Sequence, residues 1–364
     1  MGLYHLPAWP RVIGSAYGHK TYCLTAAKDG VKTCVADTRP NGARIDQKIS
    51  GVLPLTHLKS LLFGNDLISM PFFDSGGIAA EDPETEKSLL REAVRLGRSL
   101  KAKSIQLRQA EPLLVDGEPG SEISSPSLAA AAEGCTFAKR LDKARMILEL
   151  PGSSEALMAG FKSKLRSQVK KPIKEGLVAK VGGLEFLESF YKVFCINMRD
   201  LGSPVHSKLF IRRVLEEFPD KARICVVFKN DTPLAAGILI GCDGMVYNPW
   251  ASSLKEYSRL SPNMLLYWTM LQYACDSGYR RFDFGRSSIE ESTYKFKEQW
   301  GAKPKQLYWY YIHLNAPAPG RAPAPNPGAQ DDKSKFDLAI RVWQKMPVRL
   351  TQLLGPSVRK YIGL

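Results

Sequence analysis

Short strand-like runs alternate with amphipathic helical stretches along most of this 364-residue chain. In the first half, strand-like runs at residues 21–27 and 104–108 flank a stretch, residues 84–101, whose apolar residues recur at helical spacing. The second half repeats this rhythm, with helices expected over 153–176, 184–200, 207–217 and 262–277 and strands over 222–229, 234–242, 245–251 and 281–284. Strands that alternate with helices favour an α/β or α+β fold in which mixed sheets are flanked by helices.

The length predicts two domains rather than one. We expect a first domain over residues 1–150 and a second over residues 151–313, closed by a last strand at 307–313. Residues 314–335 are rich in Ala and Pro, which is typical of an extended linker. Residues 336–364 mix apolar and basic side chains and predict an amphipathic helical segment, broken at Pro347. That segment either docks on its own domain or lies on a membrane surface.

The net charge, the cysteine and histidine content and the distribution of apolar residues limit which partners, metal sites and locations we expect. The net charge of +15 predicts attraction to polyanions, such as nucleic acid, a phosphorylated or nucleotide-linked substrate, or an anionic membrane. The seven cysteines are scattered without a Cys-x-x-Cys pair and the five histidines are isolated, so we expect neither a metal site nor a disulfide framework. With no secretory signal and no apolar run of membrane-spanning length, we expect a cytoplasmic protein without a transmembrane segment.

The residues best suited to chemistry follow the apolar strand at 281–284. Gly285 permits a tight turn there, at the kind of strand end where ligands bind in open α/β sheets. Arg286 could hold a carboxylate or phosphate through two hydrogen bonds, and Lys297 suits a phosphate or the oxyanion formed when an amine attacks an acyl carbonyl. Asp283 could accept a proton from an ammonium nucleophile. Alternatively, Asp283 and Arg286 form a structural ion pair at the strand end.

Three segments around these residues, 261–268, 278–287 and 294–301, resemble the C-terminal half of FemAB-related aminoacyl and acyl transferases. More narrowly, they resemble the branch associated with exosortase (PEP-CTERM) and exopolysaccharide gene clusters. Further similar segments lie at 51–64, 70–77, 199–206 and 343–347, so the resemblance covers nearly the whole chain. It implies two tandem acetyltransferase (GNAT)-like domains.

The resemblance also implies an activity. Members move an amino acid from aminoacyl-tRNA, or another activated acyl group, to an amine of a peptidoglycan or exopolysaccharide precursor, and use no tightly bound cofactor. Lys297 matches the family lysine that handles negative charge near the reacting ester. The donor stays open among aminoacyl-tRNA, acyl-CoA and acyl-carrier protein. The chain lacks the Arg/Gln-x-x-Gly-x-Gly/Ala turn of acetyl-CoA enzymes, and also the coiled-coil insertion of many tRNA-dependent relatives.

Further residues are candidates for substrate binding. Lys162, Arg166 and Lys170, continued by Lys174, recur every four residues and predict a basic helical stripe for an RNA acceptor stem or a pyrophosphate. A solvated helix face is the alternative, and Pro172 should kink or end that helix. The other candidates, each of which could instead be structural, are Arg199, His206, Asn248, Trp250, Asn263, Ser287, Tyr294, Trp300, Lys59 and Gly77.

In a second hypothesis, the protein catalyses no reaction. The chain could be a basic scaffold that keeps the fold and binds RNA or anionic lipid through the stripe and the C-terminal segment. In the enzyme hypothesis, peripheral contact of that segment with the inner membrane face would bring the protein to its precursor. Substitution of Lys297 or Arg286 separates the two hypotheses, because only an enzyme would lose turnover.

Overall fold

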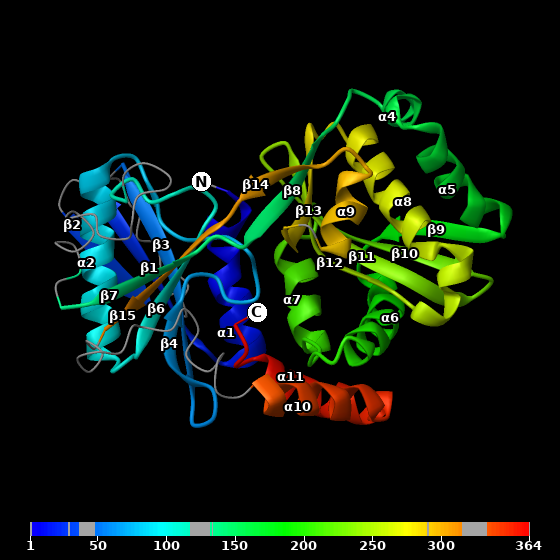
Figure 1. The fold of residues 1–364 in the computed structure, drawn as a ribbon. Helices are drawn as coiled ribbons and strands as arrows, with labels where there is room; N and C mark the ends of the chain where they lie inside the picture. Colours follow the sequence, from blue (N-terminus) through cyan, green and yellow to red (C-terminus); the bar gives the residue numbers. More distant parts are fainter. Residues whose placement is uncertain are drawn as a thin grey trace. The chain divides into compact units, whose positions relative to one another are not determined.

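The computed structural model describes residues 2–27, 30–35, 48–116, 132, 134–289, 291–314 and 333–363. The chain folds into two α/β units, each built on one mixed sheet with flanking helices (Figure 1). The first unit comprises residues 1–143, 306–332 and 361–364, and the second comprises residues 144–305 and 333–360. The predicted fold class is confirmed. Of the expected linker at 314–335, residues 315–332 lie outside the described residues.

The sheet of the first unit has eight strands, in the order β2-β1-β3-β4-β6-β15-β7, with β5 paired to β3. Its strand pairs are antiparallel except β4 and β6, which run parallel. The strands span Lys20–Ala27 (β1), Gly30–Val35 (β2), Gly51–Ser60 (β3), Gly64–Ile68 (β4), Ala79–Ala80 (β5), Ser104–Gln109 (β6), Thr136–Arg140 (β7) and Tyr308–His313 (β15).

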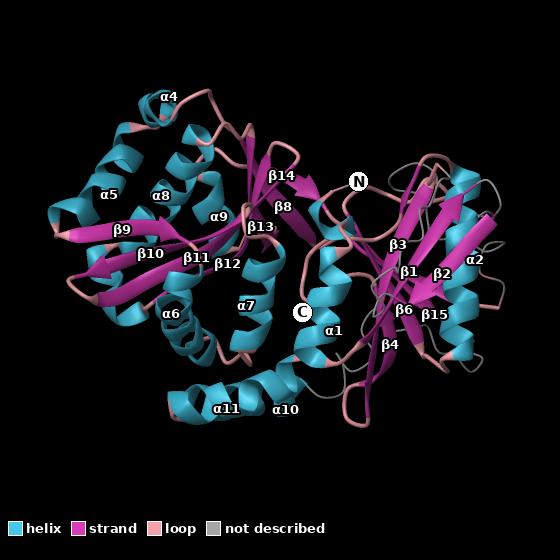
Figure 2. Cartoon of the chain, turned by 180° about the vertical axis from the view of Figure 1, so that it is seen from behind, coloured by secondary structure: helices cyan, strands magenta, loops and turns pink. Residues whose placement is uncertain are grey.

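Helices α1 (Ala8–Tyr17) and α2 (Pro83–Ser99) cover opposite faces of this sheet (Figure 2). A short 3-10 helix, η1 (Leu3–His5), precedes α1. Helix α2 begins where the Asp82 side chain accepts a hydrogen bond from the Thr85 N–H, with proline at the first helical position. Its apolar stripe is buried on the sheet, at Leu89, Leu90, Ala93 and Val94.

The sheet of the second unit has seven strands, in the order β14-β8-β13-β12-β11-β10-β9. They span Lys143–Glu149 (β8), Leu177–Gly182 (β9), Ala222–Lys229 (β10), Thr232–Cys242 (β11), Met245–Ser253 (β12), Arg281–Ser288 (β13) and Lys303–Gln306 (β14). The helices are α4 (Ser154–Gly160), α5 (Ser163–Lys174), α6 (Leu187–Asp200), α7 (Lys208–Glu217), α8 (Pro262–Asp276) and α9 (Ser292–Glu298), with 3-10 turns η2 (Leu184–Phe186) and η3 (Lys255–Leu260).

Helices cover both faces of this second sheet. Helices α4, α5 and α8 lie on one face and α6 and α7 on the other (Figures 1 and 2). Strand β11 is therefore buried on both faces, which explains why its sequence reads as a continuous apolar run without alternation. Helix α8 is likewise buried around most of its circumference.

The basic helix predicted over 153–176 is two helices. Phe161 interrupts it with an extended backbone (φ −73°, ψ 145°) and packs its ring edge-on against Trp268 and Trp300 in the core. Core packing of this ring therefore separates α4 from α5. Pro172 lies inside α5, which ends two residues later at Lys174. Because it falls in the last turn, the proline removes only one hydrogen bond near the helix end.

Two chain segments cross from one sheet to the other. Strands β7 and β8 are joined by Leu141 and Asp142, and β14 and β15 by Leu307, yet β7 and β15 belong to the first sheet and β8 and β14 to the second. The structure thus differs from the expectation that the strand at 307–313 closes the second domain. It lies between β6 and β7 in the first sheet, where backbone pairing on both sides holds it.

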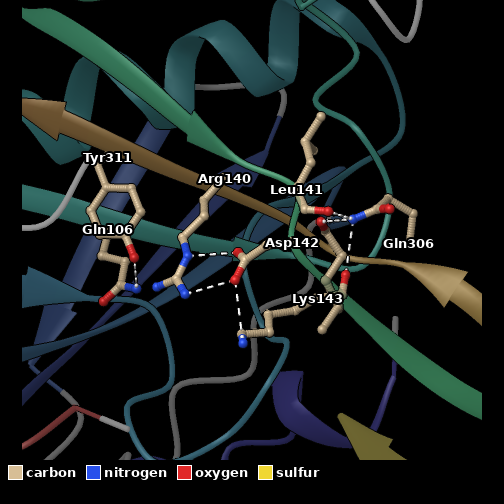
Figure 3. A network of polar contacts seen from close by, with 8 residues as sticks. Gln106, Arg140, Leu141, Asp142, Lys143, Gln306 and Tyr311 are labelled. Atoms are coloured by element: carbon tan, nitrogen blue, oxygen red, sulfur yellow. Dashed lines mark hydrogen bonds and ion pairs between the residues drawn. The ribbon is translucent and has the colours of Figure 1, made fainter. Parts of the chain in front are cut away.

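Polar contacts fix these crossing points (Figure 3). The Gln306 amide donates to the carbonyl oxygens of Leu141, Lys143 and Leu307 at 2.7, 2.9 and 2.8 Å. Arg140 binds Asp142 through two hydrogen bonds of 2.6 and 2.8 Å. Together these contacts hold the outgoing and the returning segment side by side.

The C-terminal segment forms helices α10 (Lys333–Lys345) and α11 (Val348–Arg359), separated near Pro347 as expected. Both pack on α6 of the second unit. The Gln344 amide donates to the Asp200 carbonyl at 3.1 Å. Of the two interpretations of this segment, docking on its own domain is the one that the described contacts support. No described helix combines the length and the apolar character needed to cross a bilayer.

Candidate active site

The candidate site lies where β12 and β13 diverge in the second unit (Figure 1). Their parallel register runs from Met245 opposite Arg281 to Tyr247 opposite Asp283 and, in the described residues, goes no further. At that point β12 bulges, because Ile238 of β11 lies opposite Trp250 while Ile240 lies opposite Tyr247.

Asn248 stabilises the bulge. Its amide donates to the carbonyls of Ile238 and Trp250 at 2.8 and 3.1 Å. Pro249, which has no N–H for the strand ladder, fits at such an irregular position. Asn248 is buried and therefore shapes the divergence of the strands from inside the sheet.

Asp283 is held by an ion pair at the last paired position of β13. Its Oδ2 accepts from Nε and Nη2 of Arg145 on β8, at 2.9 and 2.5 Å, and its Oδ1 accepts from the Gly285 N–H at 2.8 Å. Both carboxylate oxygens are engaged and buried. A structural ion pair between Asp283 and Arg286 is the alternative that the sequence offers. Asp283 does form an ion pair, but its partner is Arg145 rather than Arg286.

Lys297 reaches from α9 to the diverging part of β13. Its Nζ donates to the carbonyls of Gly285 and Arg286 at 3.0 and 2.8 Å. Gly285 turns the strand here with a φ of 74°, a conformation that favours glycine. The buried ammonium therefore binds carbonyl oxygens in the part of β13 that follows its last residue paired with β12. Arg286 itself is half-buried.

A cavity of about 430 Å³ opens beside Lys297. Its walls come from the ends of α6, β12 and α8 and from η3 and α9. The lining consists of Asn197, Ala251, Ser252, Ser253, Leu254, Lys255, Ser258, Asn263, Tyr267, Ser292, Thr293, Phe296 and Lys297. Most of these lining residues carry an amide, hydroxyl or ammonium group, and no Asp or Glu occurs among them. The cavity therefore suits an anionic or hydrogen-bonding ligand.

Tyr267 forms the aromatic side of this cavity. Its ring stacks on Phe284 of β13, with centroids 5.5 Å apart and planes inclined by 19°. Burial raises the pKa of the Tyr267 hydroxyl, so the group stays protonated at neutral pH. A protonated phenol in a cavity can donate a hydrogen bond or a proton.

Of the predicted site residues, the cavity lining contains Lys297 and Asn263. Several others belong to packed regions. Trp300 is buried in the core against Phe161, Ser287 is buried, and Tyr294 packs on the same core. Trp250 packs edge-on against His206 and Phe210.

His206 is buried beneath the C-terminal helix. Its Nε2 accepts from Nε of Arg359 at 3.1 Å, and its ring stacks on Phe210. Burial, followed by the Arg359 charge, holds the pKa of His206 well below its usual value. Arg199 pairs with its neighbour Asp200 at 2.7 Å.

The basic stripe runs along α5. Lys162, Lys170 and Lys174 are exposed, whereas Arg166 is half-buried and donates to the Phe161 carbonyl at 2.5 Å. Arg166 also lines a second cavity, of about 590 Å³, with Ser154, Glu155, Met158, Ala159, Trp268 and Gln272. The stripe thus offers three exposed ammonium groups and one guanidinium that stabilises the end of α4.

Lys59 and Gly77 belong to the first unit. Lys59 is an exposed residue of β3. Gly77 has its N–H bound to the Arg108 carbonyl, and its own carbonyl accepts from His5 Nε2 at 2.9 Å. The described residues contain no cluster of His, Cys, Asp or Glu that could hold a metal ion.

Sequence reasoning missed eight cavity residues with polar side chains: Asn197, Ser252, Ser253, Lys255, Ser258, Tyr267, Ser292 and Thr293. Tyr267 lies within the segment 261–268 that carries the resemblance, but it was not among the predicted site residues. Asn197 and Ser252 are joined by a 3.1 Å hydrogen bond across 55 residues of chain, which no local pattern indicates.

Comparison with known proteins places this site in a recognised domain. Residues 161–298 match the family model described as an acetyltransferase (GNAT) domain. The match includes every residue that lines the 430 Å³ cavity. The second unit therefore contains a GNAT domain. No curated protein matches the chain in sequence.

Solved structures share the fold over most of the chain. The crystal structure of FemX is similar with a TM-score of 0.60 and 14% identity, over 84% of this chain and 91% of that one. L-PGS from Bacillus licheniformis gives 0.50 and 12%, over 95% and 99%. A conserved protein of unknown function from Bacteroides thetaiotaomicron gives 0.50 and 8%, over 84% and 90%. The predicted tandem acetyltransferase-like fold is confirmed.

Proposed function

We propose that this chain is an acyl or aminoacyl transferase that moves an activated acyl group to an amine in the cavity beside Lys297. One observation carries the proposal. The Lys297 ammonium is fixed by two backbone carbonyls at the wall of a polar cavity, where two parallel strands of a GNAT domain diverge. A fixed cation at that position is suited to the negative charge that develops during acyl transfer.

The chemistry follows from the lining. The acceptor amine attacks the acyl carbonyl carbon, the new C–N bond forms, and the carbonyl oxygen becomes an oxyanion that Lys297 stabilises. The bond to the donor's oxygen or sulfur then breaks, and the leaving group takes up a proton. Tyr267 lines the same cavity, and its hydroxyl can supply that proton to an alkoxide leaving group, which is a stronger base than a phenolate; a less basic thiolate takes its proton from solvent. The nitrogen loses its proton to solvent, from which Tyr267 is reprotonated.

Asp283 receives a different role from the one first considered. Because both of its oxygens accept hydrogen bonds from Arg145 and Gly285, we assign it to fixing the end of β13 rather than to proton transfer. Arg286, next to the Gly285 turn, remains the candidate for orienting an anionic group of the substrate.

The donor should be anionic. Lys255 and Lys297 line the cavity, and Asn263, in the first turn of the 15-residue helix α8, brings that helix's N-terminus to it. Helix N-termini favour phosphate and carboxylate groups. Acyl-CoA, acyl-carrier protein and aminoacyl-tRNA all present phosphate, and the exposed lysines of α5 favour the larger polyanions.

For the acceptor, we propose an amine of a peptidoglycan or exopolysaccharide precursor made at the inner membrane face. Support comes from the sequence segments around Asp283 and Lys297, which resemble the exosortase-associated branch of FemAB-related enzymes. The fold shared with FemX is compatible with this assignment.

The test compares Lys297→Met with Lys295→Met, an exposed lysine on the same helix. Each variant is assayed with acyl-CoA, acyl-carrier protein and aminoacyl-tRNA donors against amino-sugar and peptide acceptors, with product read by mass spectrometry. We expect Lys297→Met to lower kcat about 100-fold, as removal of an oxyanion donor does. Lys295→Met should stay near wild type. Wild-type turnover in folded Lys297→Met would refute the proposal.

Polyanion binding without chemistry is a second candidate, favoured by the exposed Lys162, Lys170 and Lys174. In that case Lys297 would serve only to satisfy the Gly285 and Arg286 carbonyls. Its replacement would then lower thermal stability but leave RNA retention and any phenotype of the gene unchanged.

A further inference from the structure

The C-terminal helix α11 is docked with its apolar side outward. The buried residues on its inner face are Thr351, Gly355 and Arg359, spaced four apart. The outer face carries Leu350, Leu353 and Leu354, and Leu353 is 74% exposed. An amphipathic helix on a globular protein normally buries its leucines. In α11 the orientation is the reverse, with leucines exposed and a polar and glycine face buried.

Specific contacts fix this orientation. Gly355 approaches Val205 so closely that an added Cβ would lie 3.0 Å from its backbone nitrogen. Arg359 donates to the buried His206 at 3.1 Å. The helix cannot rotate to bury its leucines without breaking both contacts. The apolar outer face is therefore a stable feature of the second unit.

Helix α10 repeats this arrangement. Ile340 and Gln344 face the domain, since Ile340 packs on Gly202 and the Gln344 amide binds the Asp200 carbonyl. Leu338, which is 62% exposed, and Val342 face outward. Arg341 and Lys345 lie in the same outward stripe, three and seven residues after Leu338.

The charge of these two helices is almost entirely positive. Residues 333–360 contain seven Lys or Arg and one Asp, Asp337. Arg341, Lys345 and Arg349 are exposed next to the outward leucines. Apolar side chains bordered by basic ones match the boundary between acyl chains and anionic headgroups of a bilayer.

We propose that the outer face of α10 and α11 docks on an anionic lipid surface. The leucines and Val342 enter the headgroup boundary, and the basic residues contact lipid phosphates. A second copy of this chain fits less well, because a two-fold interface would bring the same basic residues face to face. The proposal does not depend on acyl transfer.

The experiment measures co-sedimentation of the full chain with phosphatidylcholine vesicles that contain or lack phosphatidylglycerol. We expect binding to the anionic vesicles, weakened by salt. Leu353→Glu/Leu354→Glu should lower the partition coefficient about tenfold or more, and Arg349→Glu roughly fivefold. Matched controls are Leu209→Glu and Arg212→Glu, exposed positions on α7. They should bind like wild type.

Two results would overturn the proposal. One is wild-type protein that sediments no better with anionic than with neutral vesicles at low salt. The other is a dimer, detected by analytical ultracentrifugation, that Leu353→Glu/Leu354→Glu dissociates while vesicle binding stays unchanged. Thermal unfolding of each variant establishes that it is folded. Transfer activity is measured without vesicles, so that the proposed acyl transfer is tested independently of lipid binding.

Discussion

At the scale of single residues, the ammonium of Lys297 is positioned by two carbonyl oxygens, at 3.0 and 2.8 Å. These contacts fix a long side chain whose rotamers would otherwise be mobile, so no reorganisation is needed when a negative charge forms nearby. The position of the ammonium depends on strand geometry, because the Gly285 and Arg286 carbonyls are free to bind the lysine only where β13 has diverged from β12.

His206 makes the stability of the second unit depend on pH. Its folded-state pKa lies well below the ordinary 6.5, because of burial and then the Arg359 charge. Below pH 6.5 the unfolded chain therefore binds a proton that the folded chain does not, and stability decreases as the pH is lowered. Well above pH 6.5 His206 is neutral in both the folded and the unfolded chain, so this loss of stability is absent there.

We expect His206→Gln to flatten this dependence. Thermal unfolding of wild type and variant from pH 5 to pH 8, conditions chosen around the value of 6.5, gives the difference. The wild type should lose up to roughly 1.4 kcal/mol per pH unit more than the variant on the acid side. Parallel curves for the two proteins would show that His206 does not titrate as proposed.

The sequence pointed to the segments that adjoin the candidate cavity but not to the side-chain pairings within them. Gly285 and Lys297 are close in sequence, so their proximity follows from one turn and one short helix. Arg145 is 138 residues before Asp283, and their ion pair depends on β8 lying next to β13. Only the strand order could have indicated that partner.

At the scale of elements, the bulge in β12 separates two strands that would otherwise continue side by side. A proline within a strand-like run, Pro249, was the available signal. The sequence did predict the strand, and it offered Trp250 as a candidate for substrate binding that could instead be structural. The shift in register puts it against His206.

Helix α11 shows the limit of amphipathic patterns. The pattern predicted the helix correctly, yet a pattern cannot say which face meets protein. Close approach at Gly355 decides it, because only a residue without a side chain allows α11 to reach Val205. The contact through this glycine depends on the shape of the segment between α6 and α7 that contains Val205, which the sequence does not display.

Gly355→Leu should therefore release α11. Overpacking costs roughly 1–3 kcal/mol, which outweighs the gain in helix propensity of about 1 kcal/mol at most. Hydrogen exchange of the α11 amides should accelerate. Ser357→Leu, an exposed position on the same helix, is the matched control and should keep its protection. Equal protection in both variants would mean that Gly355 does not govern docking.

At the scale of the whole molecule, the exchange of strands makes each sheet depend on distant parts of the chain. Strand β15 inserts between β6 and β7, and its Tyr310 and Ile312 are fully buried in the first unit. The alternation of strands and helices predicted two α/β units but could not assign this strand, because local sequence carries no information on which sheet it joins.

A fragment ending at residue 143 should therefore fail to fold cooperatively. Fusing residues 306–314 to its end through a Gly/Ser linker should restore a cooperative thermal transition by circular dichroism, since β6 and β7 then regain their shared neighbour. A fusion that carries the same residues in scrambled order serves as the control. If the unfused fragment already melts cooperatively at the same temperature, β15 is dispensable.

The position of β15 in the chain has a consequence for biosynthesis. The ribosome delivers β1 to β7 first, yet their sheet stays incomplete until residue 313 has emerged, after the entire second sheet. During that interval β6 exposes an unpaired edge. Nascent chains of this protein should therefore engage chaperones longer than chains whose N-terminal domain is contiguous.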